Sequence, residues 1–301
     1  MNWEETKAFL TPCFPEEVQS ELELLYPGEL REIRVRVDRP AVLVTAARKA
    51  ALQWRPTASE VEQLAETLSE HSLYARESET RQGFLTLRGG HRLGLCGRVL
   101  PGETGTRSLR NMTFLCLRIA GQWPRAADVL MPWARQQGQA HSMLLIGLPG
   151  TGKTTLLRDL ARQLASGKQA VSVSIADERS ELAACVDGVP QLDVGEQTDV
   201  LDHCPKAEAM AWLLRSMSPQ VLVTDELAGE TDAEAVLDAV YAGVPVLASV
   251  HGRGLHEVAQ RPALAALMAR RIFDFYAVLD TEGSGQVAAL YDRSGGALSL
   301  G

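Results

Sequence analysis

The spacing of apolar side chains predicts short helices and half-buried strands in the first 120 residues. Apolar positions recur at helical spacing in two segments and alternate with polar ones in a third, which predicts helices over Pro15–Tyr26 and Thr57–Ser72 and strands over residues 30–37 and Ala41–Thr45. Thr57-x-x-Glu60 has the form of a capping box that begins a helix. Arg39-Pro40 predicts the break between the two strands. We therefore expect a small N-terminal α+β domain over residues 1–120.

The second half of the chain has a different pattern, in which short, fully apolar runs alternate with amphipathic segments. This predicts buried strands near residues 143–146, 170–176, 221–223 and 245–250, helices over 155–164, 207–217 and 232–242, and a terminal hairpin over Phe275–Asp280 and Gln286–Tyr291. Such alternation is typical of an α/β domain with a mostly parallel sheet, whose ligands bind beyond the carboxyl ends of the strands. Prolines and small polar residues in 121–140 predict a linker with a short helix, which leaves residues 141–301 as the second domain.

A glycine-rich segment follows the first apolar run of this second domain. Residues 147–154, GLPGTGKT, match G-x-x-x-x-G-K-[ST] at every position. Gly147, Gly150 and Gly152 let successive backbone N–H groups turn inward around phosphate, above the N-terminus of a helix that begins near Lys153. The residues predicted to bind ATP are Gly147, Pro149, Gly150, Thr151, Gly152, Lys153, Thr154 and Thr155. Lys153 is expected to reach the β- and γ-phosphates, and the Thr154 hydroxyl to ligate Mg²⁺.

Acidic residues follow two of the predicted strands. Asp225-Glu226 has the form of a Walker B element, in which Asp225 holds the Mg²⁺ shell and Glu226 orients or deprotonates the attacking water. Asp177 and Glu178 end another strand, and His251 ends a third. Because carboxyl ends of parallel strands share one edge, we expect all five side chains to converge on the glycine-rich loop. The predicted catalytic set is Glu226, Lys153, His251 and Glu178.

Charge divides the chain unevenly. Residues 1–120 hold 16 basic and 16 acidic residues, so the net charge of -8 arises entirely from the remainder. Arg81–Arg118 is locally basic, with seven arginines opposed only by Glu103, and Gly89-Gly90 predicts a turn between two short strands there. The simplest interpretation is a solvated hairpin. The alternatives are that one or two arginines reach a neighbouring subunit's nucleotide, or that the hairpin binds anionic lipid or nucleic acid.

Composition narrows the class of protein. A hydrophobic fraction of 46% is ordinary for a globular protein and excludes extensive disorder. Five cysteines without metal-ligand spacing indicate reduced thiols in a cytosolic protein, and we expect no zinc site. The N-terminus lacks the pattern of a signal peptide, and no run approaches the roughly 18 apolar residues that a membrane span requires. We therefore expect a cytoplasmic protein that reaches a membrane, if at all, through a partner.

Several segments together resemble the stage III sporulation protein AA ATPases, relatives of the type II and type IV secretion and pilus motor ATPases. The segments that carry the resemblance are residues 82–98, the glycine-rich loop, 177–182, 198–202, 204–208, 215–219, Asp225-Glu226 and 250–252. The resemblance implies a RecA-like core with an N-terminal domain packed on it, a homo-oligomeric ring such as a hexamer, and a membrane-embedded channel or platform protein as partner during endospore formation. The family usually has arginine where this chain has Gln197, and hydrophobic-Gly-Arg where this chain has Leu227-Ala228-Gly229.

Other functions remain alternatives at this stage. Binding of RNA or single-stranded nucleic acid through the arginine-rich hairpin is opposed by the acidic total charge, and by a basic segment whose only stacking aromatics are Phe84 and Phe114. A small-molecule kinase is disfavoured by the Asp-Glu pair. A GTPase is disfavoured because the chain has no N-K-x-D guanine motif, although nothing in these motifs reads adenine directly. An ATP-hydrolysing motor that energises a secretion-like channel is the leading hypothesis.

Overall fold

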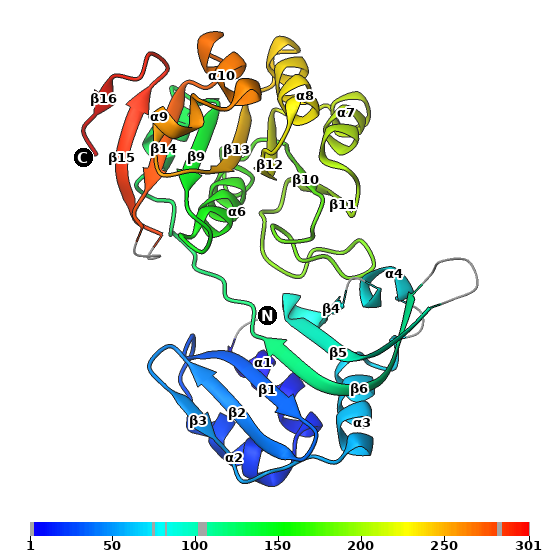
Figure 1. Ribbon diagram of the computed structural model, residues 1–301. Helices are drawn as coiled ribbons and strands as arrows, with labels where there is room; N and C mark the ends of the chain where they lie inside the picture. Colours follow the sequence, from blue (N-terminus) through cyan, green and yellow to red (C-terminus); the bar gives the residue numbers. More distant parts are fainter. Residues whose placement is uncertain (1–2, 74–75, 82, 102–106, 282–284, 301) are drawn as a thin grey trace. The chain divides into compact units, whose positions relative to one another are not determined.

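The chain folds as two compact units, Met1–Gly121 and Gln122–Gly301. The computed structural model of this 301-residue chain describes all residues except 1–2, 74–75, 82, 102–106, 282–284 and 301 (Figure 1).

The first unit is an antiparallel sheet with helices packed on its apolar face. The sheet order is β3-β2-β1-β6-β5-β4, with strands β1 (Leu30–Arg36), β2 (Arg39–Thr45), β3 (Lys49–Ala51), β4 (Phe84–Thr86), β5 (Arg92–Pro101) and β6 (Arg107–Arg118). The helices are α1 (Trp3–Leu10), α2 (Glu16–Glu23), α3 (Ala58–Leu68) and α4 (Glu77–Thr80), with 3₁₀ turns at Thr11–Cys13 and Arg88–Gly90. Buried side chains of α1, α2 and α3 meet alternate residues of the strands in one core. Each helix and strand has one apolar face, and burying these faces against one another produces the predicted α+β domain.

Of two local sequence patterns used to place elements in this unit, one predicted the structure correctly and the other did not. The predicted capping box is confirmed: Thr57 Oγ1 accepts from Glu60 N, and the Glu60 carboxylate accepts from Thr57 N at 2.7 Å. The predicted strand break at Arg39-Pro40 is wrong, because both residues lie in β2. The turn is instead made at Asp38, whose φ of 56° lies in the left-handed region that Asp tolerates. Pro40 is tolerated as the second residue of its strand.

The second unit is a mostly parallel sheet covered on both faces. Its order is β11-β10-β12-β13-β9-β14-β15-β16, with strands β9 (Met143–Gly147), β10 (Val173–Asp177), β11 (Thr198–Asp202), β12 (Val221–Glu226), β13 (Val246–His251), β14 (Phe275–Leu279), β15 (Val287–Asp292) and β16 (Ala297–Leu298). Strand β15 pairs antiparallel with both β14 and β16, and the other pairings described in this sheet are parallel. A small hairpin, β7 (Arg135–Gln136) and β8 (Gln139–Ala140), precedes it.

Each face of this sheet has its own helical layer. The helices are α5 (Met131–Ala134), α6 (Lys153–Leu164), α7 (Lys206–Ser216), α8 (Glu230–Tyr241), α9 (Leu255–Val258) and α10 (Pro262–Ala269) (Figure 1). In β9, Met143 and Leu145 belong to the core beneath α6, whereas Leu144 and Ile146 belong to the core beneath α7, α8 and α10. Because both faces of the sheet are covered, apolar side chains of β9 are needed on both of its faces.

The segment 121–140, expected to be a linker, instead contributes Ala127, Leu130 and Ala134 to the core of the second unit. These three side chains are fully buried. The free energy gained by burying them outweighs the preference of the surrounding prolines and glycines for an unstructured linker. The carboxylate of Asp159, on α6, fixes this segment by accepting from the backbone N–H groups of Arg125 and Ala127.

The predicted terminal hairpin is confirmed as β14 and β15, and β14 also pairs in parallel with β9. Gly283 and Ser284 of its predicted turn lie outside the described residues. Gly285 approaches the glycine-rich loop, since a Cβ on Gly152 would lie 2.8 Å from Gly285 Cα.

Candidate active site

Four neighbouring strands end at the same edge of the parallel sheet, and each carries a residue of the predicted site. In the order β10, β12, β13, β9, these strands end at Asp177, Glu226, His251 and Gly147. Gly147 and His251 are register partners across β9 and β13. The structure therefore brings the glycine-rich loop, the Asp-Glu pair and the histidine to one edge.

The glycine-rich loop needs its glycines for two different reasons. Gly150 and Gly152 have φ values of 79° and 96°, which side chains rarely adopt. Gly147 was also expected to need unusual angles, but it is a regular residue of β9, and its requirement is steric. A Cβ there would lie 2.5 Å from Thr151 Oγ1. That hydroxyl is buried and donates to the Leu148 carbonyl at 2.8 Å, which closes the turn.

The remaining loop residues lie around the start of α6. Gly152 is the N-cap, so Lys153 and Thr154 are the first two residues of the helix. Thr154 and Thr155 are half-buried, and Pro149 is exposed. The N–H groups of this first turn face the loop, which is the arrangement that binds phosphate in proteins.

Lys153 and Glu226 are joined through His251. The Lys153 ammonium donates to the carbonyl oxygens of Gly147 and Leu148 at 2.8 Å and lies 3.1 Å from His251 Nδ1. Because an ammonium can only donate, Nδ1 is the acceptor and the proton of a neutral ring is on Nε2. Nε2 lies 2.9 Å from Glu226 Oε2 and donates to it. Lys153 is only 6% exposed, and burial lowers its pKa.

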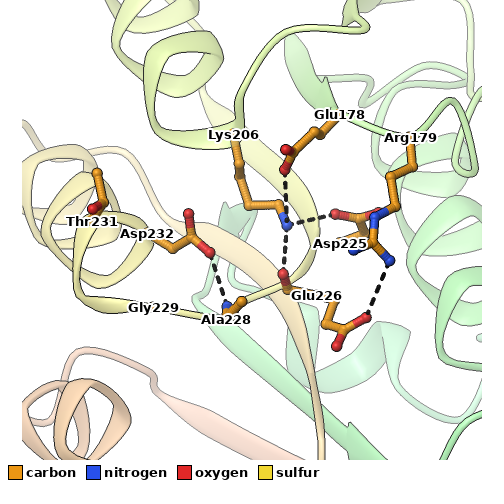
Figure 2. A pocket seen from close by; sticks show the side chains of 9 residues that line it. All are labelled: Glu178, Arg179, Lys206, Asp225, Glu226, Ala228, Gly229, Thr231 and Asp232. Carbon is orange, nitrogen blue, oxygen red and sulfur yellow. Dashed lines mark hydrogen bonds and ion pairs between the residues drawn. The ribbon is translucent and has the colours of Figure 1, made fainter. Parts of the chain in front are cut away.

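A pocket of about 320 Å³ opens beside Glu226 (Figure 2). Its lining residues come from the ends of β10 and β12 and the starts of α7 and α8: Glu178, Arg179, Lys206, Asp225, Glu226, Ala228, Gly229, Thr231 and Asp232. Four of them are carboxylates, which makes the pocket acidic at neutral pH. Arg179 Nη1 lies 3.9 Å from Glu226 Oε2, and the Asp232 carboxylate accepts from Ala228 N at 2.9 Å.

The donor set fits a magnesium ion that is bound together with phosphate. Among the described residues, no group of three or more His, Cys, Asp or Glu side chains is arranged to hold a metal. Mg²⁺ typically uses one or two protein oxygens together with substrate phosphates. Asp225 is 5% exposed, and the Thr154 hydroxyl lies in the first turn of α6. Both predicted ligands are hard oxygen donors, as Mg²⁺ prefers.

Asp177 reaches the expected edge but serves the backbone rather than the pocket. It is fully buried, and its carboxylate accepts from the backbone N–H groups of Glu181, Leu182 and Ala183 at 2.8–3.2 Å. Burial raises the pKa of Asp177 to about 6. Its neighbour Glu178, with a side chain 45% exposed, is the one that faces the pocket. Asp177 therefore anchors the loop that follows β10.

Two cations of this pocket were not anticipated from the sequence. Lys206 begins α7, and its buried ammonium lies 2.9 Å from Asp225 Oδ1. Both residues belong to segments that carry the family resemblance, Arg179 to 177–182 and Lys206 to 204–208, but neither was predicted to lie in the site. One local feature of the sequence could have drawn attention to Lys206. It follows Pro205 and so stands in the first turn of a helix, where acidic residues are favoured and a lysine is unusual. The two positions where the family usually has arginine lie in different surroundings. Gln197 is exposed before β11, whereas Gly229 lines the pocket.

The predicted arginine-rich hairpin is built from β4, β5 and β6, with Gly89 and Gly90 at positive φ in its turn. Contacts within the first unit include those of Arg118 and Arg92. Arg118 lies 3.4 Å from Glu32, and the Arg92 guanidinium lies 3.9 Å from the centre of the Phe84 ring. Arg88, Arg98 and Arg110 are exposed, whereas Glu103 lies outside the described residues.

Comparison with known proteins identifies the family. The profile described as "Sporulation stage III, protein AA" matches residues 18–298. The chain is 42% identical over 275 residues to the stage III sporulation protein AA of Bacillus subtilis (strain 168), covering 90% of this chain and 89% of that protein. The chain belongs to the stage III sporulation protein AA family. The family expected from the sequence is thereby confirmed.

Solved structures show the same fold in proteins of low sequence identity. The Yersinia pseudotuberculosis ATPase DotB aligns with a TM-score of 0.63 and 16% identity, over 93% of this chain and 80% of that chain. The pilus retraction motor PilT with bound ADP aligns with a TM-score of 0.59 and 15% identity, over 87% and 76%. The RecA-like α/β fold with its mostly parallel sheet is confirmed. Within the described residues, no helix is both long and apolar enough to span a membrane.

Proposed function

We propose that this member of the stage III sporulation protein AA family binds ATP with Mg²⁺ and hydrolyses it. The observation that carries the proposal is the contact chain from Lys153 through His251 to Glu226. It connects the residue that would hold the γ-phosphate to the carboxylate that would act on water. A loop that bound phosphate for structural reasons alone would not require this connection.

Each residue has a defined part in the proposed reaction. Backbone N–H groups of the loop and the N-terminus of α6 bind the phosphates, and Lys153 exchanges its carbonyl contacts for phosphate oxygens. Glu226 accepts a proton from the attacking water or orients it, while Nε2–H of His251 keeps the carboxylate aimed. Glu178, across the pocket, adds a second carboxylate near the water. Mg²⁺, held by Thr154 and Asp225, would neutralise charge on the phosphates.

The finer proposal is that hydrolysis performs mechanical work. The fold is shared with proteins named as an ATPase and a pilus retraction motor, and the family is a sporulation family. We propose a homo-oligomeric ring in the cytoplasm that delivers conformational changes to a membrane-embedded channel or platform protein. The γ-phosphate would hold adjacent subunits in one arrangement, and its release after hydrolysis would free them to move.

The carboxylate assignment is tested by Glu226→Gln. The amide keeps the shape of the side chain but cannot accept a proton, so turnover should fall by about 10²–10⁴-fold while ATP still binds. Steady-state ATP hydrolysis and binding of a fluorescent ATP analogue measure the two effects. Glu234→Gln, at an exposed glutamate of α8, is the matched control and should hydrolyse ATP normally. Normal turnover in Glu226→Gln would reject this carboxylate.

The phosphate site is tested separately by Lys153→Ala. Removing a charged donor to the β- and γ-phosphates should abolish measurable ATP binding. The same substitution at Lys168, an exposed lysine after α6, should leave binding unchanged. Unchanged affinity in Lys153→Ala would contradict nucleotide binding at this loop.

A further inference from the structure

Lys206 is a buried cation at a position that neither helix stability nor the phosphate loop explains. It is only 6% exposed and is the first residue of α7. A positive charge in the first turn of a helix opposes the helix dipole, and burial of an ammonium removes its hydration. Its position therefore requires nearby oxygen atoms that offset both costs.

Three oxygens from two strand ends surround the ammonium (Figure 2). Nζ lies 2.9 Å from Asp225 Oδ1 and 3.9 Å from Glu178 Oε2, and it donates to the backbone carbonyl of Glu226. Asp225 and Glu226 end β12, whereas Glu178 follows β10. The pairing of β12 with β13 is irregular between Val223 and Glu226, so this strand end is not fixed by a regular ladder. Lys206 supplies an additional constraint there.

We propose that Lys206 is a built-in counter-cation, which holds the Asp225–Glu226 strand end in position and keeps a divalent ion from binding these oxygens before nucleotide arrives. It is a positioning residue for the reaction proposed above, on which its catalytic significance rests. Two carboxylates and a backbone carbonyl are the oxygen types that divalent cations select. Lys206 occupies the point between them, so Mg²⁺ gains a place beside Asp225 only when phosphate oxygens contribute.

The charges around the pocket support this assignment. Without Lys206, the buried Asp225 carboxylate would keep no cation at ion-pair distance among the described residues. Arg179 does not replace Lys206, because its side chain is 67% exposed and faces Glu226 Oε2 from 3.9 Å. Removing one partner of a buried pair leaves an uncompensated charge, whereas removing both is often nearly neutral. This asymmetry makes the proposal testable by stability alone.

The decisive experiment is thermal unfolding of the full chain without nucleotide, in EDTA and in about 10 mM MgCl₂. Lys206→Met should lower the Tm in EDTA by about 5–10 °C, because the carboxylates lose their counter-cation. Mg²⁺ should recover at least about half of that loss by binding the freed oxygens, and should change the wild-type Tm by less than about 1 °C. Lys168→Met, at an exposed lysine of the same unit, should behave as wild type.

Two further variants separate charge from packing. Lys206→Arg keeps the positive charge and should retain most of the Tm and the indifference to Mg²⁺. The double variant Lys206→Met with Asp225→Asn removes both charges, so it should melt higher in EDTA than Lys206→Met alone and lose the response to Mg²⁺. If Lys206→Met is too unstable to purify, the recovery of a folded protein by adding Asp225→Asn gives the same information.

The proposal is overturned if Lys206→Met melts as wild type does, or if Mg²⁺ alone stabilises the wild type as much as the variant. ATP turnover provides a separate measurement. Lys206→Met should lower kcat by about tenfold or more with less than about a threefold change in KM, since Lys206 contacts the carboxylates and not the phosphate loop. A wild-type chain without ATPase activity would refute the proposed function, whereas the nucleotide-free Tm measurements would still decide the role of Lys206.

Discussion

A single histidine joins the phosphate side of the site to its carboxylate side. His251 accepts from Lys153 through Nδ1 and donates to Glu226 through Nε2, so its tautomer is fixed by its two partners. Neither contact alone would require a histidine. A side chain with one acceptor and one donor on opposite sides of a rigid ring satisfies both, and this explains why the residue that ends β13 can link two functions.

We therefore expect His251→Ala to impair hydrolysis more than binding. Without the Nε2–H donor, Glu226 is no longer held in one orientation, and kcat should fall by about 10–100-fold with a small change in KM. Steady-state kinetics measures the split, and His256→Ala on α9, at an exposed histidine, is the control. Equal loss of kcat and of ATP affinity would instead place His251 among the binding residues.

At the scale of elements, a second histidine connects strands of the first unit. His91 is 1% exposed, precedes β5, and accepts through Nδ1 from the N–H of Ala120 beyond the end of β6. Its Nε2 is buried without a hydrogen-bond partner in the described part of the chain. Burial lowers the pKa of His91 to about 4, because a charged ring would lose its hydration.

This pKa predicts that the first unit loses stability in mild acid. The unfolded chain binds a proton near pH 6.5 and the folded chain only near pH 4, so the stability contributed by neutral His91 is complete above pH 6.5 and is lost as the pH falls toward 4. Between pH 7 and 5 the expected loss is about 2 kcal/mol. Urea unfolding at both pH values measures it. His91→Gln should remove this loss, whereas His71→Gln, with a side chain 76% exposed in the wild type, should keep it.

Elements whose signals are local were predictable, and features that depend on several elements were not. The capping box of α3 and the apolar run of β12 are contained within a few consecutive residues, so the pattern located both. The contact between Lys153, His251 and Glu226 followed in outline, because strand ends of a parallel sheet share an edge. The burial of Lys206 did not follow, since it depends on where β10, β12 and α7 meet. Asp177 shows the converse case, because its position was anticipated but its use by three backbone N–H groups was not.

At the scale of the whole molecule, we propose that a second subunit completes each site, because of how charge is distributed along the chain and because two arginines usual in the family are absent. Residues 121–301 carry the entire acidic excess, whereas β5 and β6 of the first unit carry exposed arginines such as Arg98 and Arg110. Gln197 and Gly229 stand where the family resemblance leads us to expect arginine. A positively charged side chain that contacts the γ-phosphate in addition to Lys153 would then come from another copy of the chain, as an arginine finger does.

If a neighbouring subunit completes the site, as we propose, ATP turnover depends on assembly. We expect turnover per subunit to rise at least about tenfold with protein concentration and then to level off, because an arginine supplied by a neighbour stabilises the transition state only in the assembled ring. The measurement is steady-state hydrolysis over a wide range of protein concentration, with the mass of the particles determined by light scattering in the same samples. The rise in turnover should coincide with the rise in mass, and added salt should shift both to higher concentration because it screens the attraction between opposite charges. If turnover per subunit stays constant while the mass changes, each chain contains a complete site and the exposed arginines of β5 and β6 have no part in hydrolysis.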